Sequence, residues 1–204
     1  MSRAAWVSLL LGACGASACG SSPPSTFYTL SPERASAQQA PFHTVKLRRP
    51  GIPGYLDRPE IVTRIVDHRL RVADTDRWAA PLDEMLGHTL AQDLQERLAG
   101  AVVFTEDGAI TADADVTVEI DVRSFDVDER GQVNLVAEVA VEKGDAHEPA
   151  GARAVHLRET PRSGTTAALV SAMSDVLGKL SDEVTAMLLG RPPESLARDD
   201  AAPR

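Results

Sequence analysis

The two cysteines, Cys14 and Cys19, are the residues best suited to covalent chemistry, and no other cysteine occurs among the 204 residues of the chain. They follow an apolar run and precede a short stretch rich in Gly, Ser and Pro. A disulfide between them would close only a tiny loop and would stabilise no core. The alternative is acylation of a thiol at the end of an export signal.

The residues ahead of the cysteines have the layout of such a signal. Arg3 supplies a positive charge, residues 4–13 are uncharged and mostly apolar, and small residues follow. The apolar run is too short to cross a bilayer, which needs about 20 apolar residues, and no second run of that kind appears later. We therefore expect residues 1–18 to be a lipoprotein signal peptide.

Two tetrapeptides resemble a bacterial lipobox, "LGAC" ending at Cys14 and "ASAC" ending at Cys19. Leu11 favours the first, but cleavage there would leave a leader of only 13 residues, whereas cleavage before Cys19 leaves 18. We favour Cys19 and keep Cys14 as the alternative. The anchor would be a diacylglycerol plus an N-acyl chain, since two or more buried acyl chains hold a protein stably at a membrane.

The residue that follows each cysteine bears on which membrane holds the anchor. It is Gly in both cases, and not the Asp that usually retains a lipoprotein at the inner membrane. We therefore expect the periplasmic leaflet of the outer membrane. The formal net charge of -9 argues against nucleic acid as a partner, because phosphate binding needs clustered Lys and Arg.

The remainder of the chain has no pattern typical of catalysis or metal binding. The histidines lack metal-ligand spacing, and neither a nucleophile elbow nor a phosphate-binding Gly-rich loop is present. Glu119 and Asp121 occupy outward positions of an alternating strand, where a solvated face is expected. We therefore expect a protein that is not an enzyme and has no cofactor.

Hydrophobic periodicity predicts one α+β domain over residues 43–190, a mostly antiparallel sheet with two long amphipathic helices on one face. Leucine recurs every four residues from Leu82 to Leu98 in the first helix, and residues 164–189 form the second. Residues 19–42 would be the lipidated tether and a first short strand at 27–30, and residues 191–204 a disordered tail.

Further strands are expected at 43–49, 60–66, 68–73 and 102–105. Residues 115–143 alternate as a hairpin with its turn near 129–131, and a loop over 143–151 would lead to a last strand at 153–160. Periodicity does not account for Pro50–Arg64, "PGIPGYLDRPEIVTR". This segment is either a structural turn or an exposed loop that contacts a partner.

At these residues the chain resembles the PqiC family of ABC-type transport auxiliary lipoproteins, also called membrane-integrity-associated transporter subunits. The matching parts are "CGSSPPSTFYTL" from Cys19, "GIPGYLDRPEIVTR", and "RWAAPLDEMLGHTLAQDLQERL" from Arg77. Family-pattern positions, which would be core or partner contacts, are Pro53, Tyr55, Leu56, Arg64, Trp78 and Leu82. Trp78, just ahead of a helix, is expected to be buried packing.

The resemblance implies a non-catalytic outer-membrane lipoprotein of an intermembrane phospholipid transport system. Its partners would be a mammalian-cell-entry (MCE) protein and the permease and ATPase of the same ABC system, and a homo-oligomeric ring would suit the end of a conduit. Two rival hypotheses are a lipid-anchored envelope hydrolase and a lipoprotein that assists outer-membrane assembly.

Overall fold

The computed structural model describes residues 23–65, 68–144 and 148–191. The expected signal peptide, Cys14, Cys19 and the tail from residue 192 lie outside the described residues. The elements in chain order are β1 (Thr26–Tyr28), β2 (Gln38–Gln39), β3 (Thr44–Leu47), β4 (Glu60–Ile65), β5 (Arg69–Trp78), α1 (Leu82–Arg97), β6 (Leu98–Ala99), β7 (Val102–Thr105), β8 (Val116–Val127), β9 (Val133–Lys143), β10 (Glu148–Glu159) and α2 (Thr166–Leu188).

A five-stranded sheet in the order β10-β9-β8-β3-β7 forms one layer of the fold. The pairs β8–β9 and β9–β10 are antiparallel, whereas β3 is parallel to both β7 and β8. Alternation along β8 and β9 sends Val118, Ile120, Leu135 and Val139 into the core, where each is at least 96% buried. The expected α+β fold with a mostly antiparallel sheet is confirmed, with β3 as a parallel insertion.

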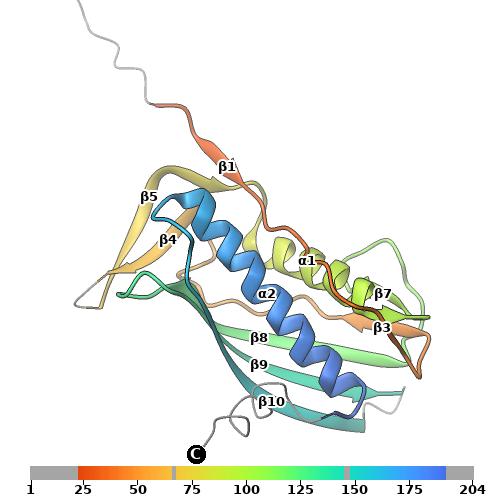
Figure 1. Cartoon of the computed structure of the whole chain (residues 1–204). Helices are drawn as coiled ribbons and strands as arrows, with labels where there is room; N and C mark the ends of the chain where they lie inside the picture. The colour runs from red at the N-terminus through yellow and green to blue at the C-terminus, as the bar shows by residue number, and fades with distance from the viewer. Residues whose placement is uncertain (1–22, 66–67, 145–147, 192–204) are drawn as a thin grey trace, which may run out of the picture.

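Both long helices cover the same face of this sheet (Figure 1). Helix α2 lies over β9 and β10, and α1 lies beside it and contacts β7. The predicted leucine stripe of α1 is buried along its whole length, from Leu82 to Leu98. Helix α2 begins at the N-cap Thr165, whose hydroxyl accepts the Ala168 N–H, and ends before Gly190, which adopts a positive φ of 68°.

A second, three-stranded sheet in the order β1-β5-β4 lies at one end of the molecule, beside the start of α2 (Figure 1). Strands β4 and β5 form an antiparallel hairpin, and β1 pairs with β5 in parallel, with Phe27 opposite Arg77. The N-terminal strand expected at 27–30 is present as β1, which is shorter and spans residues 26–28.

The loop expected over residues 143–151 is wrong in its second half, because β10 already begins at Glu148. Pro149 and Gly151 make this stretch a poor strand by composition. Its backbone nevertheless pairs with the long strand β9, and the register shifts between these two residues. A tertiary partner that supplies ladder hydrogen bonds outweighs local propensity here.

Candidate functional site

The segment that joins β1 to β3 connects the N-terminal strand to the body of the fold. Figure 1 shows it running along the two helices from the end of β1. The Ser31 N–H donates to the Ser174 hydroxyl of α2 at 3.1 Å, and the Glu33 N–H donates to the Asp93 carboxylate of α1 at 2.6 Å. The segment is thus hydrogen-bonded to both helices.

Asp93 and Arg97 together hydrogen-bond the backbone N–H and the carbonyl of Glu33. Arg97 Nη1 donates to the Glu33 carbonyl at 3.3 Å and to the Asp93 carbonyl at 3.0 Å, and it lies 3.7 Å from an Asp93 carboxylate oxygen. Asp93 is fully buried and Arg97 nearly so. Because buried charges are tolerated only when paired and hydrogen-bonded, these contacts account for two ionisable groups inside the fold.

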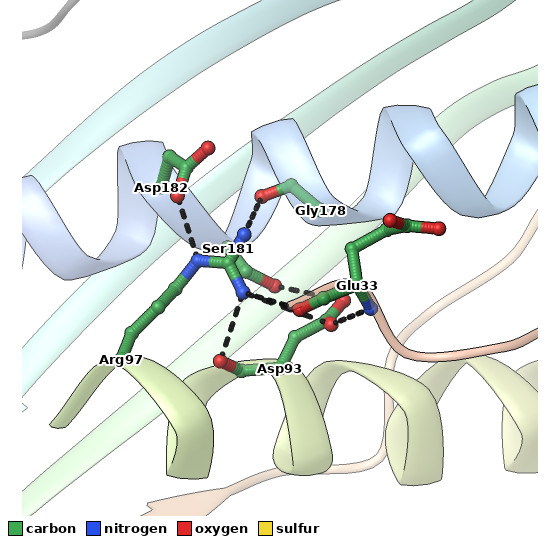
Figure 2. Close-up of polar contacts among 6 residues, drawn as sticks. All are labelled: Glu33, Asp93, Arg97, Gly178, Ser181 and Asp182. Atoms are coloured by element: carbon green, nitrogen blue, oxygen red, sulfur yellow. Dashed lines mark hydrogen bonds and ion pairs between the residues drawn. The ribbon is translucent and has the colours of Figure 1, made fainter. Parts of the chain in front are cut away.

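The same guanidinium also joins the two helices to each other (Figure 2). Arg97 Nε donates to the Asp182 carboxylate at 2.7 Å, and Nη2 donates to the Gly178 carbonyl at 2.9 Å. Ser181 adds a long contact of 3.5 Å to the second Asp93 oxygen. We call the set Asp93, Arg97, Gly178 and Asp182 the Glu33 clamp.

Burial raises the pKa of Asp93 from its ordinary value of 3.8 to about 6. The Glu33 N–H and the Arg97 charge act in the opposite direction, because they favour the carboxylate. Burial therefore disfavours the charged form of Asp93, and the hydrogen bond from Glu33 and the charge of Arg97 offset part of this effect.

The segment approaches α2 closely at Gly178. A methyl group at this position would lie 2.9 Å from the Glu33 Cβ, closer than real Cβ atoms are found. Glycine in the middle of a helix usually weakens it. Here the missing side chain leaves the space that the Glu33 Cβ and Cγ occupy.

A second polar cluster joins the β3–β4 connection to the central sheet. The Tyr55 hydroxyl donates to Asp126 at 2.6 Å, and Arg64 Nη2 donates to the same carboxylate oxygen at 2.8 Å. The Arg64 guanidinium lies 6.0 Å from the centroid of the Tyr55 ring. Burial, with the charge of Asp126, raises the pKa of Tyr55 above its ordinary value, so the phenol stays neutral and donates.

The position of Asp126 follows from an irregularity in β8. The register with β9 shifts between Val122 and Ser124, and the alternation resumes with Phe125 in the core. Asp126 then points to the opposite face, where Tyr55 and Arg64 cover it to 1% side-chain exposure. The structure thus brings two family-pattern residues, Tyr55 and Arg64, together around Asp126. The sequence analysis did not single out Asp126.

The remaining family-pattern residues lie in or next to the core. Leu56, Trp78 and Leu82 are buried, and Pro53 is half-buried. The Trp78 N–H donates to the Pro59 carbonyl at 2.7 Å, which ties the end of β5 to the start of β4. In the same Pro50–Arg64 segment, the side chains of Asp57, Arg58 and Pro59 are exposed, and a partner could reach them.

A cleft of about 430 Å³ lies between the β4–β5 hairpin, the β8–β9 turn and the start of α2. Ile61, Ile65, Val127 and Leu169 supply apolar lining, and Arg71 is among the polar side chains that border it. Within the described part of the chain, no group of three or more His, Cys, Asp or Glu residues is placed to hold a metal ion.

The clamp residues escaped the sequence analysis although a signal for them exists. Asp93 and Arg97 are interleaved with Leu90, Leu94 and Leu98, so they lie on the buried arc of α1. On a solvent-facing arc, the same spacing would indicate an ordinary surface ion pair. For Asp126, the signal is the break in alternation before Phe125.

A comparison with family models gives one match, the ABC-type transport auxiliary lipoprotein component, over residues 28–185. This chain belongs to that family. The match begins inside β1 and ends inside α2, so the segment between β1 and β3, both polar clusters, α1 and most of α2 fall within it. The resemblance found in the sequence is thereby confirmed.

Solved structures show that this auxiliary lipoprotein shares its fold with other proteins. A crystal structure of an uncharacterized protein matches with a TM-score of 0.68 at 20% identity, covering 80% of this chain and 97% of the other. A Xanthomonas campestris protein matches with a TM-score of 0.66 at 19% identity, covering 87% and 100%. A search of curated proteins found no match.

Among the described residues of this auxiliary lipoprotein, neither helix combines the length and the apolar character needed to cross a bilayer.

Proposed function

We propose that this auxiliary lipoprotein is a non-catalytic subunit of an MCE/ABC-type phospholipid transport system, anchored by acylated Cys19 in the periplasmic leaflet of the outer membrane. It would receive the end of an MCE protein whose permease and ATPase partners work at the inner membrane. The family supports the role in ABC-type transport, and the lipobox and the following Gly support the anchor and its membrane.

The hydrogen bonding of the segment after β1 to both helices, Ser31 to α2 and Glu33 to α1, is the observation that carries this proposal. A docking subunit must pass force between its membrane anchor and the surface that meets its partner. Strand β1 pairs with β5, and the clamp then holds the next segment against α1 and α2. Load on the anchor would therefore reach the helices and the sheet rather than a free linker.

The exposed tip of the Pro50–Arg64 segment is the part of the family pattern that suits partner contact. Asp57 and Arg58 are exposed there, while the neighbouring Leu56 is buried and Tyr55 is bonded to Asp126. A rigid base under an exposed tip presents its side chains in one arrangement, which lowers the entropy cost of binding.

Site-specific crosslinking in intact cells tests the partner. A photoreactive residue at Arg58 should capture the MCE protein of the system, whereas the same residue at exposed Thr111, between β7 and β8, should not. Capture of barrel-assembly components from Arg58, or equal capture of the MCE protein from both positions, would contradict the proposed role.

The anchor needs a separate test because Cys14 and Cys19 compete for it. Intact mass of the mature protein should show a chain beginning at Cys19 and carrying three acyl chains. Cys19→Ser should abolish acylation and Cys14→Ser should leave it unchanged. A native protein with an unmodified thiol at Cys19 would refute the assignment.

A further inference from the structure

The three-stranded sheet β1-β5-β4 has an outer face that carries exposed apolar side chains. Phe27 is 64% exposed, Leu70 39% and Val72 38%, and they account for three of the five large apolar residues exposed in the described structure. The other two, Val102 and Ile110, lie at β7 and in the segment that follows it. Exposed apolar side chains gathered on one small sheet mark a contact surface.

The geometry of β5 places these three side chains on the same face. Arg71 and Ala73 line the cleft beside α2, and Asp76 accepts a hydrogen bond from Thr166 of α2, so these residues point inward. Val72, next to Arg71 and Ala73, therefore points outward, and so does Leu70. The register of β4 with β5 shifts between Glu60 and Val62, so Arg77, opposite Glu60, lies on the same face as Val72, opposite Val62. Phe27 is the direct partner of Arg77 on β1.

Both arginines on this face are paired. Arg77 lies 3.3 Å from Glu60, and Arg64, which is opposite Leu70, is bonded to Asp126. Exposed Asp74 of β5 adds one negative charge, which is small beside the net charge of -9 of the whole chain. A surface of this kind can approach lipid headgroups with less repulsion than the rest of the protein would meet.

The tether brings this face to the membrane. Seven peptide units separate Cys19 from Thr26 at the start of β1. A chain of that length spans at most about 25 Å even when fully extended. Strand β1 is the edge of the three-stranded sheet, and this sheet forms one end of the molecule (Figure 1).

We propose that the outer face of the β1-β5-β4 sheet, through Phe27, Leu70 and Val72, rests on the bilayer that holds the lipid anchor. The proposal rests on acylation of Cys19, which is part of the proposed function. Apolar side chains enter the headgroup boundary while the five-stranded sheet and the far ends of both helices extend away from it. The membrane contact then orients the domain as well as retaining it.

Depth-dependent fluorescence quenching tests this contact on the full acylated protein. With the leader removed and Cys19 acylated, Leu70→Cys or Val72→Cys supplies a single thiol for an environment-sensitive dye. Ile110→Cys is the matched control, because Ile110 is also apolar and is 50% exposed. It precedes β8, whose other end carries Asp126 beside Arg64, so it lies roughly a strand length, about 30 Å, from the hairpin.

The labelled proteins are reconstituted in vesicles of phosphatidylethanolamine and phosphatidylglycerol, with and without spin-labelled lipid. We expect quenching at positions 70 and 72 to exceed that at 110 at least twofold. Vesicle flotation with equal quenching at the three positions would refute the oriented contact and leave the anchor intact. Failure of the native protein to float would refute the anchor and this proposal together.

Discussion

Arg97 Nε and an Asp182 carboxylate oxygen meet at 2.7 Å between α1 and α2, and the rest of the same guanidinium binds the carbonyls of Glu33, Asp93 and Gly178. One side chain therefore joins three segments that are far apart in the sequence. Because it is almost completely buried, its contacts cannot be replaced by water.

Arg97→Met should lower the free energy of unfolding by about 3 kcal/mol, because it leaves the buried Asp93 without its cation and removes the side-chain donor of the Glu33, Asp93 and Gly178 carbonyls. Urea unfolding of the two proteins measures the difference. Arg123→Met is the control, since Arg123 pairs with Asp121 and Glu138 on an exposed surface. That control should lower the free energy of unfolding by less than about 1 kcal/mol. Equal losses in the two variants would show that the buried contacts of Arg97 contribute no more than a surface ion pair.

Asp93 should make stability depend on pH between about 4 and about 6. Its pKa is raised from 3.8 in the unfolded chain to about 6 in the fold, so the folded state binds the proton more tightly. Its contribution to stability is fully present below the unfolded pKa and is lost as the pH rises through the folded pKa.

Comparison with Asp93→Asn isolates this contribution from that of other carboxyl groups. The stability of the natural protein minus that of the variant should fall as the pH rises from about 4 to about 6 and stay level above that range. Urea unfolding at a series of pH values provides the data. A difference that rises over this interval would show that the fold lowers the pKa of Asp93.

Gly178→Ala should destabilise the protein although alanine favours helices. The added methyl would lie 2.9 Å from the Glu33 Cβ, and overpacking of this kind costs about 1 to 3 kcal/mol. Gly87→Ala in α1 is the matched control, because its nearest neighbour would be Pro50 Cδ at an ordinary 3.4 Å. That variant should gain up to about 1 kcal/mol from helix propensity.

Limited proteolysis would show whether the loss at Gly178 acts through the clamp. In Gly178→Ala the segment around Glu33 should be cut faster than in the natural protein, whereas Gly87→Ala should leave its rate unchanged. If both alanine variants were more stable than the natural protein, the Glu33 segment would be able to move away from α2 without a loss of stability.

Tyr55→Phe should remove one of the two side-chain hydrogen bonds to Asp126 and keep the ring beside Arg64. We expect a loss of about 1 to 2 kcal/mol, since the acceptor is a buried carboxylate that retains the Arg64 donor. Thermal or urea unfolding measures it. Tyr28→Phe, whose side chain is also half-buried, is the control and should cost less; a larger loss at Tyr28 would contradict the role given to Asp126.

The local elements of this fold follow from patterns in the amino-acid sequence. The four-residue leucine repeat predicts α1, and alternation from Val116 to Val141 predicts the hairpin, because one buried face forces one period on each element. The family also follows from short motifs that stand in sequence order. These signals are local, so they can be interpreted without knowing which elements pack against each other.

Contacts between distant segments were settled only by the tertiary structure. Glu33 and Asp93 are 60 positions apart, and Tyr55 and Asp126 are 71 apart. Hydrophobic periodicity, which is a local pattern, cannot predict contacts between residues so far apart. The parallel placement of β3 and the strand character of residues 148–152 depend likewise on partners elsewhere in the chain. A buried carboxylate or guanidinium is stable only where folding brings donors and acceptors around it, and that arrangement exists only in three dimensions.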